Sequence, residues 1–365
     1  MPDRRINIVA GSAYSIVGGI QAVNRMVVRE LAASNLLRRA FFLWDDAATA
    51  TADGLAAQTR KQVNFYAIRR KSFAYDLLRQ TLRYPGDLWL CTHVNYASLG
   101  YLTSWCRRRR VGVMLHAAEL DGAFTLPKRF GLRRVGHVYV VSEFTKKKAV
   151  RLGVRPERVT VIYNAVDDPC PDYTPRAARN GNQTVLFVGR MDERYKGQME
   201  LLDAMVLLRQ RLPDLRLMFI GGGSTLGEWK DEAKRRNLSD VVGFRGRISE
   251  AELFRAYEEA MLFAMPSHNE GFGLVYAEAM AHGLPCIGSD RDAASEVIVH
   301  GETGYCVPAG NSTALADAIS TLVKSPELRA RFGQAGRQRF AANFTAGCYH
   351  ERLIAAMTGW RDSLG

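Results

Sequence analysis

Residues 265–283 read MPSHNEGFGLVYAEAMAHG, and this stretch predicts a strand, a turn and a helix in succession. An apolar run ends near Ser267, glycines bracket the loop that follows, and a helical pattern continues through Ala281 until Gly283. Strand–turn–helix units of this kind build parallel α/β sheets. The stretch therefore predicts an α/β fold with a loop at the carboxyl end of a strand, where such sheets bind ligands.

Two carboxylates flank this loop, Glu270 before the predicted helix and Glu278 within it. On one straight helix they would lie about 12 Å apart along the axis and about 80° apart around it, too far to share a proton or a metal. With Glu270 on the loop, the two acids can instead contact different parts of one extended ligand. The helix N-terminal amides at Phe272, Gly273 and Leu274 would then face a phosphate. Helix-capping or solvated roles for the two acids remain the alternative.

The same alternation of strands and helices fills the whole chain, whose 365 residues suit two domains. The segment 167–183 is rich in Pro, Asp, Asn and Gly and reads as an interdomain linker. We expect one domain over 1–170 and a second over 171–344, with a C-terminal helix over 345–365 that packs back onto the first. The predicted strands lie in 6–11, 40–44, 87–93, 111–116, 137–142, 159–163, 184–190, 216–223, 241–246, 262–267, 285–289 and 305–309.

Three further segments place polar groups where a strand ends. GRMDERYKG (189–197) brings Arg190 and Lys196 to a strand-to-helix turn, which suits a diphosphate, although two surface cations are the alternative. SIVGGIQ (15–21) places Gly18 and Gly19 at a helix start without the G-x-G-x-x-G spacing of dinucleotide sites. His116 follows a strand directly, and a structural role for a single histidine stays open.

Positive charge is concentrated in the first half of the chain. Residues 1–179 contain 29 Lys and Arg against 14 Asp and Glu, whereas residues 180–365 contain 21 and 23. Basic clusters at 60–71, 107–110, 128–134 and 146–148 predict an anionic partner, either a membrane surface or nucleic acid. The aromatic residues interleaved with them would dock onto a membrane: Phe65, Tyr66, Phe73, Tyr75 and Phe130.

The six cysteines form no CxxC pair and have no histidines at zinc-finger spacing. We interpret them as buried or free thiols in a reducing cytoplasm, and the scattered histidines predict no metal site. No apolar run approaches the roughly 20 residues that a membrane span needs. INIVA (6–10) is read as a buried strand rather than as the core of a signal peptide.

Together these motifs resemble the family-4 retaining glycosyltransferases. The resemblance rests on the glycines near residue 18, HAAE (116–119), 141–167, LFVGRMDERYKG (186–197) and HNEGFGLVYAEAMAHGLPCIGSD (268–290). It covers nearly the whole chain, and the E-x7-E pair formed by Glu270 and Glu278 is its most specific part. It implies the GT-B architecture, in which two Rossmann-like doubly wound domains face each other across a cleft.

The resemblance also implies roles for single residues. Arg190 and Lys196 match the cations that hold the donor diphosphate, without a metal or another cofactor. Glu270 matches the residue that holds the hydroxyls of the transferred sugar, and Glu278 the one on the nucleotide ribose. Amides at Phe272, Gly273 and Leu274 would meet the diphosphate and sugar, and Gly18 and Gly19 the phosphate from the opposite domain. His116 matches a histidine near the sugar on the acceptor side.

The function implied is a cytoplasmic glycosyltransferase, peripheral to the inner face of the plasma membrane. It would move a hexose from a nucleotide sugar, with GDP-mannose favoured over a UDP-sugar, to a lipid-linked saccharide in surface polysaccharide assembly. A nucleotide-sugar epimerase and a soluble sucrose- or glycogen-type synthase are alternatives on the same fold. A basic nucleic-acid-binding protein is the alternative of another class, but no nucleic-acid motif accompanies the charge.

Overall fold

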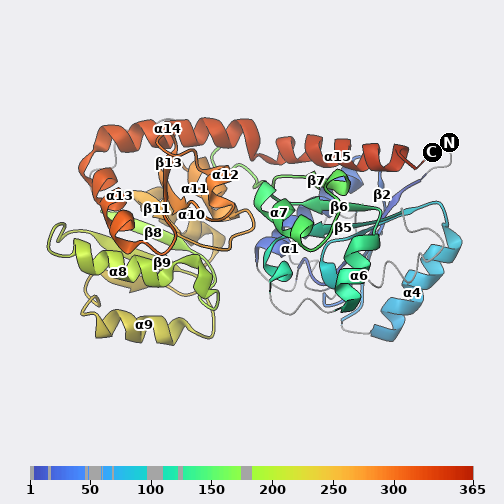
Figure 1. The fold of residues 1–365 in the computed structure, drawn as a ribbon, viewed down its shortest axis with the longest axis horizontal. Helices are drawn as coiled ribbons and strands as arrows, with labels where there is room; N and C mark the ends of the chain where they lie inside the picture. Colours follow the sequence, from blue (N-terminus) through green and yellow to red (C-terminus); the bar gives the residue numbers. More distant parts are fainter. Residues whose placement is uncertain are drawn as a thin grey trace. The chain divides into compact units, whose positions relative to one another are not determined.

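The computed structural model describes residues 4–14, 18–45, 48, 59, 61–67, 70–96, 110–121, 126–173 and 183–364. The chain divides into two compact units (Figure 1). The N-terminal unit comprises residues 1–164 and 346–365, and the C-terminal unit comprises residues 165–345. The sequence places the boundary after residue 170, whereas the segment 165–173 belongs with the C-terminal unit.

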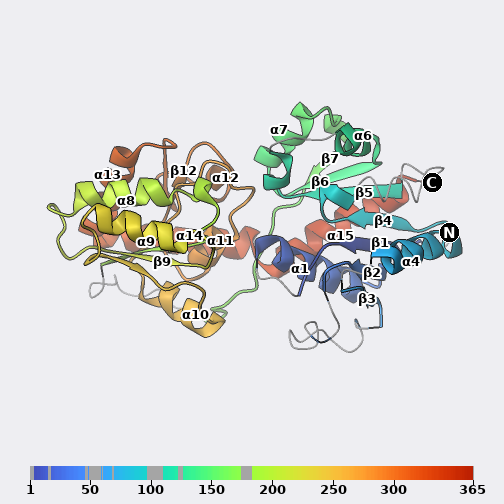
Figure 2. The same cartoon turned by 90° about the horizontal axis from the view of Figure 1, so that it is seen from below.

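The N-terminal unit contains a parallel sheet of seven strands in the order β3-β2-β1-β4-β5-β6-β7. Its strands are β1 (Ile6–Ala10), β2 (Leu37–Phe42), β3 (Val63–Phe65), β4 (Leu88–Cys91), β5 (Val111–Leu115), β6 (His137–Val140) and β7 (Val159–Val161). All residues of β1, β4 and β5 are buried, because helices cover both faces of the sheet (Figure 2). This burial explains why these strands read as continuous apolar runs.

The helices of this unit are α1 (Gly19–Ala33), α4 (Arg70–Arg83), α6 (Leu126–Arg134), α7 (Glu143–Arg151) and α15 (Ala346–Asp362), with short 3₁₀ turns at Val94–Tyr96, Ala118–Leu120 and Pro156–Arg158. Ser142 caps α7, as predicted, because its Oγ accepts a hydrogen bond from the Thr145 amide at 3.0 Å. The C-terminal helix α15 packs on this unit. His350 Nδ1 lies 2.8 Å from Glu30 Oε2 on α1, and the Trp360 ring meets Tyr139 of β6 edge to face.

The C-terminal unit contains a parallel sheet of six strands in the order β10-β9-β8-β11-β12-β13. Its strands are β8 (Thr184–Val188), β9 (Arg216–Ile220), β10 (Val242–Phe244), β11 (Leu262–Ala264), β12 (Cys286–Ser289) and β13 (Gly304–Val307). Its helices are η5 (Arg194–Lys196, a 3₁₀ turn), α8 (Gln198–Leu208), α9 (Leu226–Arg235), α10 (Glu250–Glu259), α11 (Leu274–Ala281), α12 (Ala294–Val297), α13 (Ser312–Lys324) and α14 (Pro326–Asn343).

The strand order reverses between β1 and β4 in one unit and between β8 and β11 in the other. In doubly wound sheets, ligands bind outside the carboxyl ends of the strands at such a reversal. The loops after β8 and β11 are residues 189–193 and 265–273. Because β8 and β11 are hydrogen-bonded neighbours, the motifs at 189–197 and 265–283 lie next to each other at the reversal.

Every strand expected from the sequence is present within a few residues of its predicted bounds. The structure also contains β3, which the sequence did not predict. Its three residues, VNF, lie in a basic segment without alternating polarity. The helix α11 begins after Gly273, which adopts φ +81°, a left-handed conformation that favours glycine. None of the helices that the structure describes combines the length and apolarity needed to cross a membrane.

Candidate functional site

Lys196 lies at the centre of the candidate site in the C-terminal unit. Its Nζ is 2.8 Å from Glu270 Oε2 and 3.2 Å from Glu193 Oε2, and the side chain is largely buried. Burial by itself lowers the pKa of this amine, but the negative charge of Glu270, with Tyr195 and Glu193, outweighs burial and raises the pKa above its usual value. Lys196 is therefore a permanent cation that holds the Glu270 carboxylate.

Backbone features allow this cation to reach its partner. A Cβ atom on Gly189, at the end of β8, would come 3.0 Å from Lys196 Cδ, so the glycine leaves room for the lysine chain. The buried amide of Gln198 donates to the carbonyl oxygens of Arg190 and Glu193 at 3.3 and 3.2 Å, which fixes the loop between them. The loop after β8 is thus held in place from inside the unit.

Arg190 differs from Lys196 because its side chain is exposed. Its Nη2 lies 3.5 Å from Asp192 Oδ2, a weak surface contact. Asp192 itself is anchored to the loop after β9, where the Ser224 hydroxyl and the Thr225 amide donate to its Oδ1 at 2.7 and 3.2 Å. These hydrogen bonds lower the pKa of the Asp192 carboxyl, and the hydrogen bond from Ser224 has the largest effect. The guanidinium of Arg190 therefore remains available to an anion in solvent.

Glu270 is positioned by Asp292, a residue that the sequence did not single out. Asp292 Oδ2 accepts from the Glu270 amide and from the Ser267 hydroxyl, both at 2.7 Å, and its Oδ1 accepts from the Ala294 amide at 3.0 Å. Burial raises the pKa of Asp292 to about 6, although these hydrogen bonds oppose the shift. An aspartate two residues before a helix is a recognisable turn signal, but it does not indicate which loop the aspartate anchors.

The helix α11 follows this loop with its N-terminus near Glu270. The first amides of a helix generally have no partner within it, although the Tyr276 amide here already donates to the carbonyl oxygen of Gly273, the N-cap residue, at 2.9 Å. Phe272 is buried and meets Phe344 edge to face, so its side chain fixes the chain as it enters the helix. The predicted phosphate-facing segment therefore starts a helix of eight residues, as the sequence indicated.

Glu278 lies one turn into α11, half-buried. The hydroxyl of Tyr257, on α10, donates to Glu278 Oε2 at 2.7 Å. Burial raises the pKa of the Glu278 carboxyl, and the hydrogen bond from Tyr257 partly lowers it. Tyr257 thus orients the second acid of the E-x7-E pair, and sequence spacing gave no sign of it.

In the N-terminal unit, Gly18 and Gly19 begin α1 directly after the loop that follows β1. Gly18 has φ −179°, an extended conformation open to any residue. The buried carboxylate of Asp45 anchors the same loop, accepting from the Ser12 hydroxyl at 2.7 Å and the Ala13 amide at 2.6 Å. Residues 15–17 of the predicted SIVGGIQ segment lie outside the described part of the chain.

His116 follows β5 and is buried. Its Nε2 lies 3.1 Å from the carbonyl oxygen of Thr92, which only accepts, so Nε2 carries the proton. Burial lowers the pKa of His116 to about 4, and the Thr92 contact opposes this, so the ring is neutral at pH 7. Within the described part of the chain, its Nδ1 is then a bare acceptor, buried and without a hydrogen-bond partner. Glu119 Oε2 is likewise buried without a partner among these residues, whereas Glu119 Oε1 accepts a hydrogen bond from the His116 amide at 2.6 Å.

The predicted site residues thus fall into two groups. Seven lie in the C-terminal unit, on or beside the loops after β8 and β11: Arg190, Lys196, Glu270, Phe272, Gly273, Leu274 and Glu278. Three lie in the N-terminal unit, after β1 and β5: Gly18, Gly19 and His116.

Comparison with known protein families finds a matching family model for each half of the chain. Residues 17–168 match the family model described as Glycosyltransferase Family 4, and residues 174–339 match the model described as Glycosyl transferases group 1. This chain belongs to the family-4 glycosyltransferases. The family membership inferred from the sequence is therefore confirmed.

Curated relatives include two mycobacterial mannosyltransferases. The phosphatidyl-myo-inositol mannosyltransferase of Mycobacterium leprae is 38% identical over 157 residues, which are 43% of this chain and 41% of that protein. The GDP-mannose-dependent alpha-(1-6)-phosphatidylinositol monomannoside mannosyltransferase of Mycolicibacterium smegmatis is 28% identical over 295 residues, 76% of this chain and 77% of the relative. A glycogen synthase of Mycobacterium tuberculosis is 31% identical over 186 residues, 51% of this chain and 45% of that protein. The match to the first of these relatives thus spans less than half of its length.

Solved structures agree on the fold. HepE from Anabaena, solved in complex with UDP and glucose, superimposes with a TM-score of 0.78 at 20% identity and covers 98% of this chain and 100% of that one. Sucrose-phosphate synthase from Thermosynechococcus elongatus gives a TM-score of 0.76 at 22% identity, with 99% of both chains covered. The prediction of two Rossmann-like domains of the GT-B class is confirmed.

Proposed function

We propose that this protein is a retaining hexosyltransferase that transfers a sugar, with mannose from GDP-mannose favoured, to a lipid-linked saccharide at an anionic membrane. The observation that carries the proposal is the Lys196–Glu270 ion pair, formed by the two loops at the strand reversal of the C-terminal unit. A nucleotide sugar offers both an anionic diphosphate and vicinal hydroxyls. The pair presents a cation and a hydrogen-bond acceptor side by side, which suits that combination.

Each part of the donor has a matching group in this unit. Lys196 has three N–H donors, of which Glu270 and Glu193 take two, so that the third serves a phosphate oxygen. The exposed Arg190 adds a planar, bidentate cation, and the α11 N-terminus adds backbone amides. Glu270 then accepts from sugar hydroxyls, and Glu278, held by Tyr257, accepts from the ribose.

In the proposed reaction, the bond between the anomeric carbon and the diphosphate oxygen breaks while the acceptor hydroxyl attacks from the same face. The departing diphosphate takes the hydroxyl proton and leaves as a nucleoside diphosphate, so no protein nucleophile is needed. Lys196 and Arg190 stabilise the charge that develops on the leaving oxygen. His116, neutral with Nδ1 as a bare acceptor, would accept a hydrogen bond from a sugar hydroxyl without taking its proton.

The relatives support mannose as the favoured sugar, because two of them are named mannosyltransferases and one is named as GDP-mannose-dependent. The glycogen synthase relative and the UDP-bound HepE keep a soluble synthase and a UDP-sugar as the competing options.

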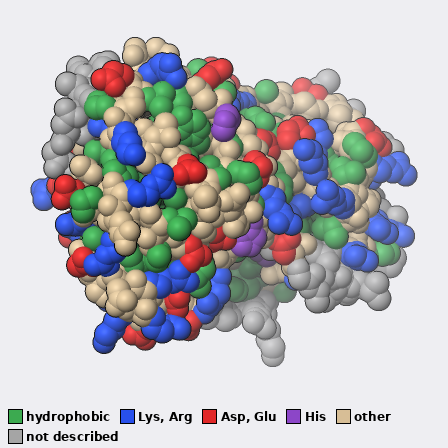
Figure 3. Space-filling model, turned by 60° about the vertical axis from the view of Figure 1, so that its left-hand side comes forward, with side chains coloured by type: hydrophobic (Ala, Val, Ile, Leu, Met, Phe, Trp, Pro, Cys, Tyr) green, Lys and Arg blue, Asp and Glu red, His purple; other side chains and the backbone are tan. Residues whose placement is uncertain are grey.

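The N-terminal unit supports the membrane part of the proposal. On the right-hand part of the face in Figure 3, Lys and Arg side chains of this unit lie close together. The helix α4 exposes three apolar side chains at helical spacing, Tyr75, Leu78 and Leu82, which are 65%, 50% and 72% exposed. Arg79 and Arg83 are exposed on the same helix. An apolar stripe beside cations fits the interface of an anionic bilayer.

The structure corrects part of the predicted docking surface. Tyr66 and Phe73 are buried in the hydrophobic core of the N-terminal unit, where their rings meet edge to face, so they cannot contact a membrane. Tyr75 is exposed, and Phe130 is exposed with the guanidinium of Arg134 3.9 Å from the centre of its ring. A basic stretch with aromatic residues does not reveal which rings face inward, because the packing of the segment on the sheet decides this. Cytoplasmic location, peripheral to the membrane, remains part of the proposal.

Donor screening tests the proposed function. The melting temperature of the purified protein is measured with GDP, UDP and ADP sugars, and the best donor is then incubated with a lipid-linked saccharide. The proposal expects stabilisation by GDP-mannose and release of GDP that depends on the acceptor lipid. Consumption of a UDP-sugar without any acceptor would establish the epimerase, and transfer to a soluble glucan the synthase. Salt-sensitive retention on DNA or RNA without nucleotide-sugar affinity would establish the nucleic-acid-binding alternative.

A further inference from the structure

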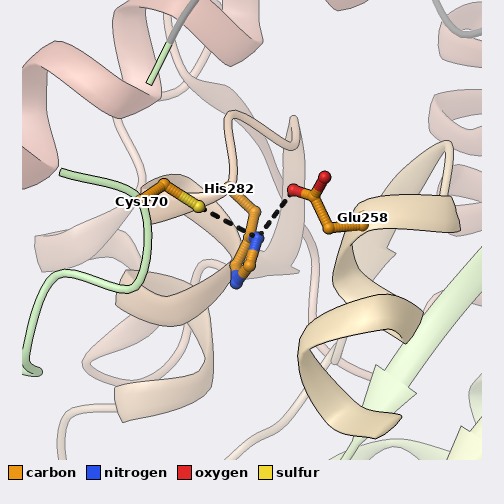
Figure 4. Close-up of side chains that lie close together, drawn as sticks. All are labelled: Cys170, Glu258 and His282. Atoms are coloured by element: carbon orange, nitrogen blue, oxygen red, sulfur yellow. Dashed lines mark hydrogen bonds and ion pairs between the residues drawn. The ribbon is translucent and has the colours of Figure 1, made fainter. Parts of the chain in front are cut away.

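Three side chains that are distant in the sequence meet inside the C-terminal unit. Cys170 comes from the segment 165–173, Glu258 from α10, and His282 is the C-cap residue of α11 (Figure 4). Cys170 Sγ lies 3.6 Å from His282 Nδ1, and Glu258 Oε1 lies 3.1 Å from the same nitrogen. All three ligand atoms lie within 4.8 Å of one another.

The arrangement differs from a catalytic relay. In a nucleophile–histidine–carboxylate relay, the nucleophile and the carboxylate contact opposite nitrogens of the ring. Here both contact Nδ1, so three donor atoms converge on one point (Figure 4). Tetrahedral zinc, with bonds of about 2.3 Å to sulfur and about 2.0 Å to nitrogen and oxygen, needs its ligand atoms about 3.3–3.6 Å apart. The observed separations of 3.1 and 3.6 Å are close to that requirement.

We propose that Cys170, His282 and Glu258 bind one divalent cation of borderline softness, Zn²⁺ being the best match, with a water as the fourth ligand. Thiolate and imidazole select zinc over the harder magnesium and calcium ions. Binding converts the Cys170 thiol to a thiolate and releases its proton to solvent. The sequence spacing gave no sign of such a site, because 112 residues separate Cys170 from His282.

The surroundings supply the charge balance and the rigidity that such a site needs. The nearby Arg337 guanidinium is paired bidentately with Asp168, with both nitrogens 2.7 Å from the carboxylate oxygens. This pairing balances the positive charge of Arg337, which also donates to the Cys170 carbonyl oxygen at 2.8 Å. The Tyr257 ring stacks on His282 at 5.1 Å between ring centres, and Phe254 meets it edge to face at 4.8 Å. Packed rings of this kind fix the orientation of a metal-binding imidazole.

The site would act on the donor-binding residues through α10. Glu258 follows Tyr257 directly, and Tyr257 donates to Glu278, the acid proposed to hold the ribose. A metal held by Glu258 would therefore fix Tyr257 and attach the segment 165–173 to α10 and α11. The role is a positioning one and rests on residues apart from Arg190, Lys196 and Glu270.

Cobalt substitution tests the metal site directly on the full-length protein. The chain is stripped with a chelator and titrated with Co²⁺, whose bond to a thiolate gives a near-ultraviolet charge-transfer band. We expect the band to saturate at one equivalent and to disappear when Zn²⁺ is added. The variant Cys170→Ser should lose the band. Cys306→Ser should keep it, because Cys306 is an equally half-buried thiol on β13 outside the site.

A thermal measurement complements the spectrum. Zn²⁺ should raise the melting temperature of the wild type and of Cys306→Ser, with little effect on Cys170→Ser, and Glu258→Gln should weaken the metal affinity. Absence of a thiolate band in the wild type would overturn the proposal, as would an unchanged band in Cys170→Ser. The three side chains would then form a hydrogen-bonded thiol–imidazole–carboxylate group only.

Discussion

The ammonium group of Lys196 lies 2.8 Å from the carboxylate of Glu270, although 74 residues separate the two in the chain. Each residue follows a strand at the centre of the same sheet, β8 for Lys196 and β11 for Glu270, and these strands are hydrogen-bonded neighbours. The Lys196 ammonium thus holds the Glu270 side chain in a fixed orientation. Such preorganisation would suit the proposed transfer of a sugar.

Replacing Glu270 with Ala should abolish sugar transfer while nucleotide binding survives. The carboxylate is proposed to hold the transferred sugar, whereas Lys196, Arg190 and the α11 amides hold the diphosphate. We expect kcat to fall about 100- to 1000-fold, the usual loss when one transition-state contact is removed, with the dissociation constant for the nucleotide nearly unchanged. Steady-state kinetics and calorimetry measure the two quantities. Glu302→Ala removes an exposed acid of the same unit and should leave both unchanged.

The Tyr257–Glu278 hydrogen bond should contribute to nucleotide affinity. Tyr257→Phe leaves Glu278 without this donor at 2.7 Å, and a hydrogen bond to a charged group contributes about 1.5–3 kcal/mol. We expect the nucleoside diphosphate to bind about tenfold more weakly, and Glu278→Ala to weaken binding further. The double variant should resemble Glu278→Ala alone, because both changes act through one contact. Full additivity of the two effects in calorimetry would contradict the assignment, and Tyr305→Phe serves as the control.

His116 should make the folded state less stable in acid. Its pKa in the folded protein is about 4, below the ordinary value of 6.5, so the unfolded chain binds more protons between these two values. The free energy of unfolding should therefore fall by about 3 kcal/mol on this account between pH 7 and pH 4. His116→Gln keeps a donor for the Thr92 carbonyl but removes the titration.

Chemical denaturation across this pH range measures the effect as the difference between wild type and variant. That difference is needed because Asp292, whose pKa is raised to about 6, contributes an opposite slope between about pH 4 and pH 6. An identical pH dependence for wild type and His116→Gln would show that His116 does not titrate in this way.

The exposed face of α4 should govern binding to anionic vesicles. Changing Tyr75, Leu78 and Leu82 to Ser removes the apolar stripe while leaving every buried side chain of the helix in place. Since burying one such side chain contributes about 1.5–3 kcal/mol, we expect the vesicle partition coefficient to fall at least about tenfold. Vesicle sedimentation at two salt concentrations measures it. Val206 and Leu207, similarly exposed on α8 of the C-terminal unit, give the control variant, and an equal loss there would contradict the assignment.

Local patterns in the sequence predicted the elements of the fold well. The fully buried strands β4 and β5 are apolar runs, Ser142 caps a helix, and Gly273 precedes one, since these features depend only on neighbouring residues. The strand β3 and the burial of Tyr66 and Phe73 were missed. A three-residue strand carries too little periodicity, and the inward face of α4 is set by the sheet it packs on.

The sequence by itself determined the family, the two doubly wound units and the residues after β8 and β11, because a strand-to-helix turn is built from adjacent residues. Only the tertiary structure decided which of these residues meet. The pairing of Lys196 with Glu270, the anchoring of Glu270 by Asp292 and the convergence of Cys170, Glu258 and His282 all join separate loops. Such contacts depend on the order of strands in the sheet, and no spacing along the chain records that order.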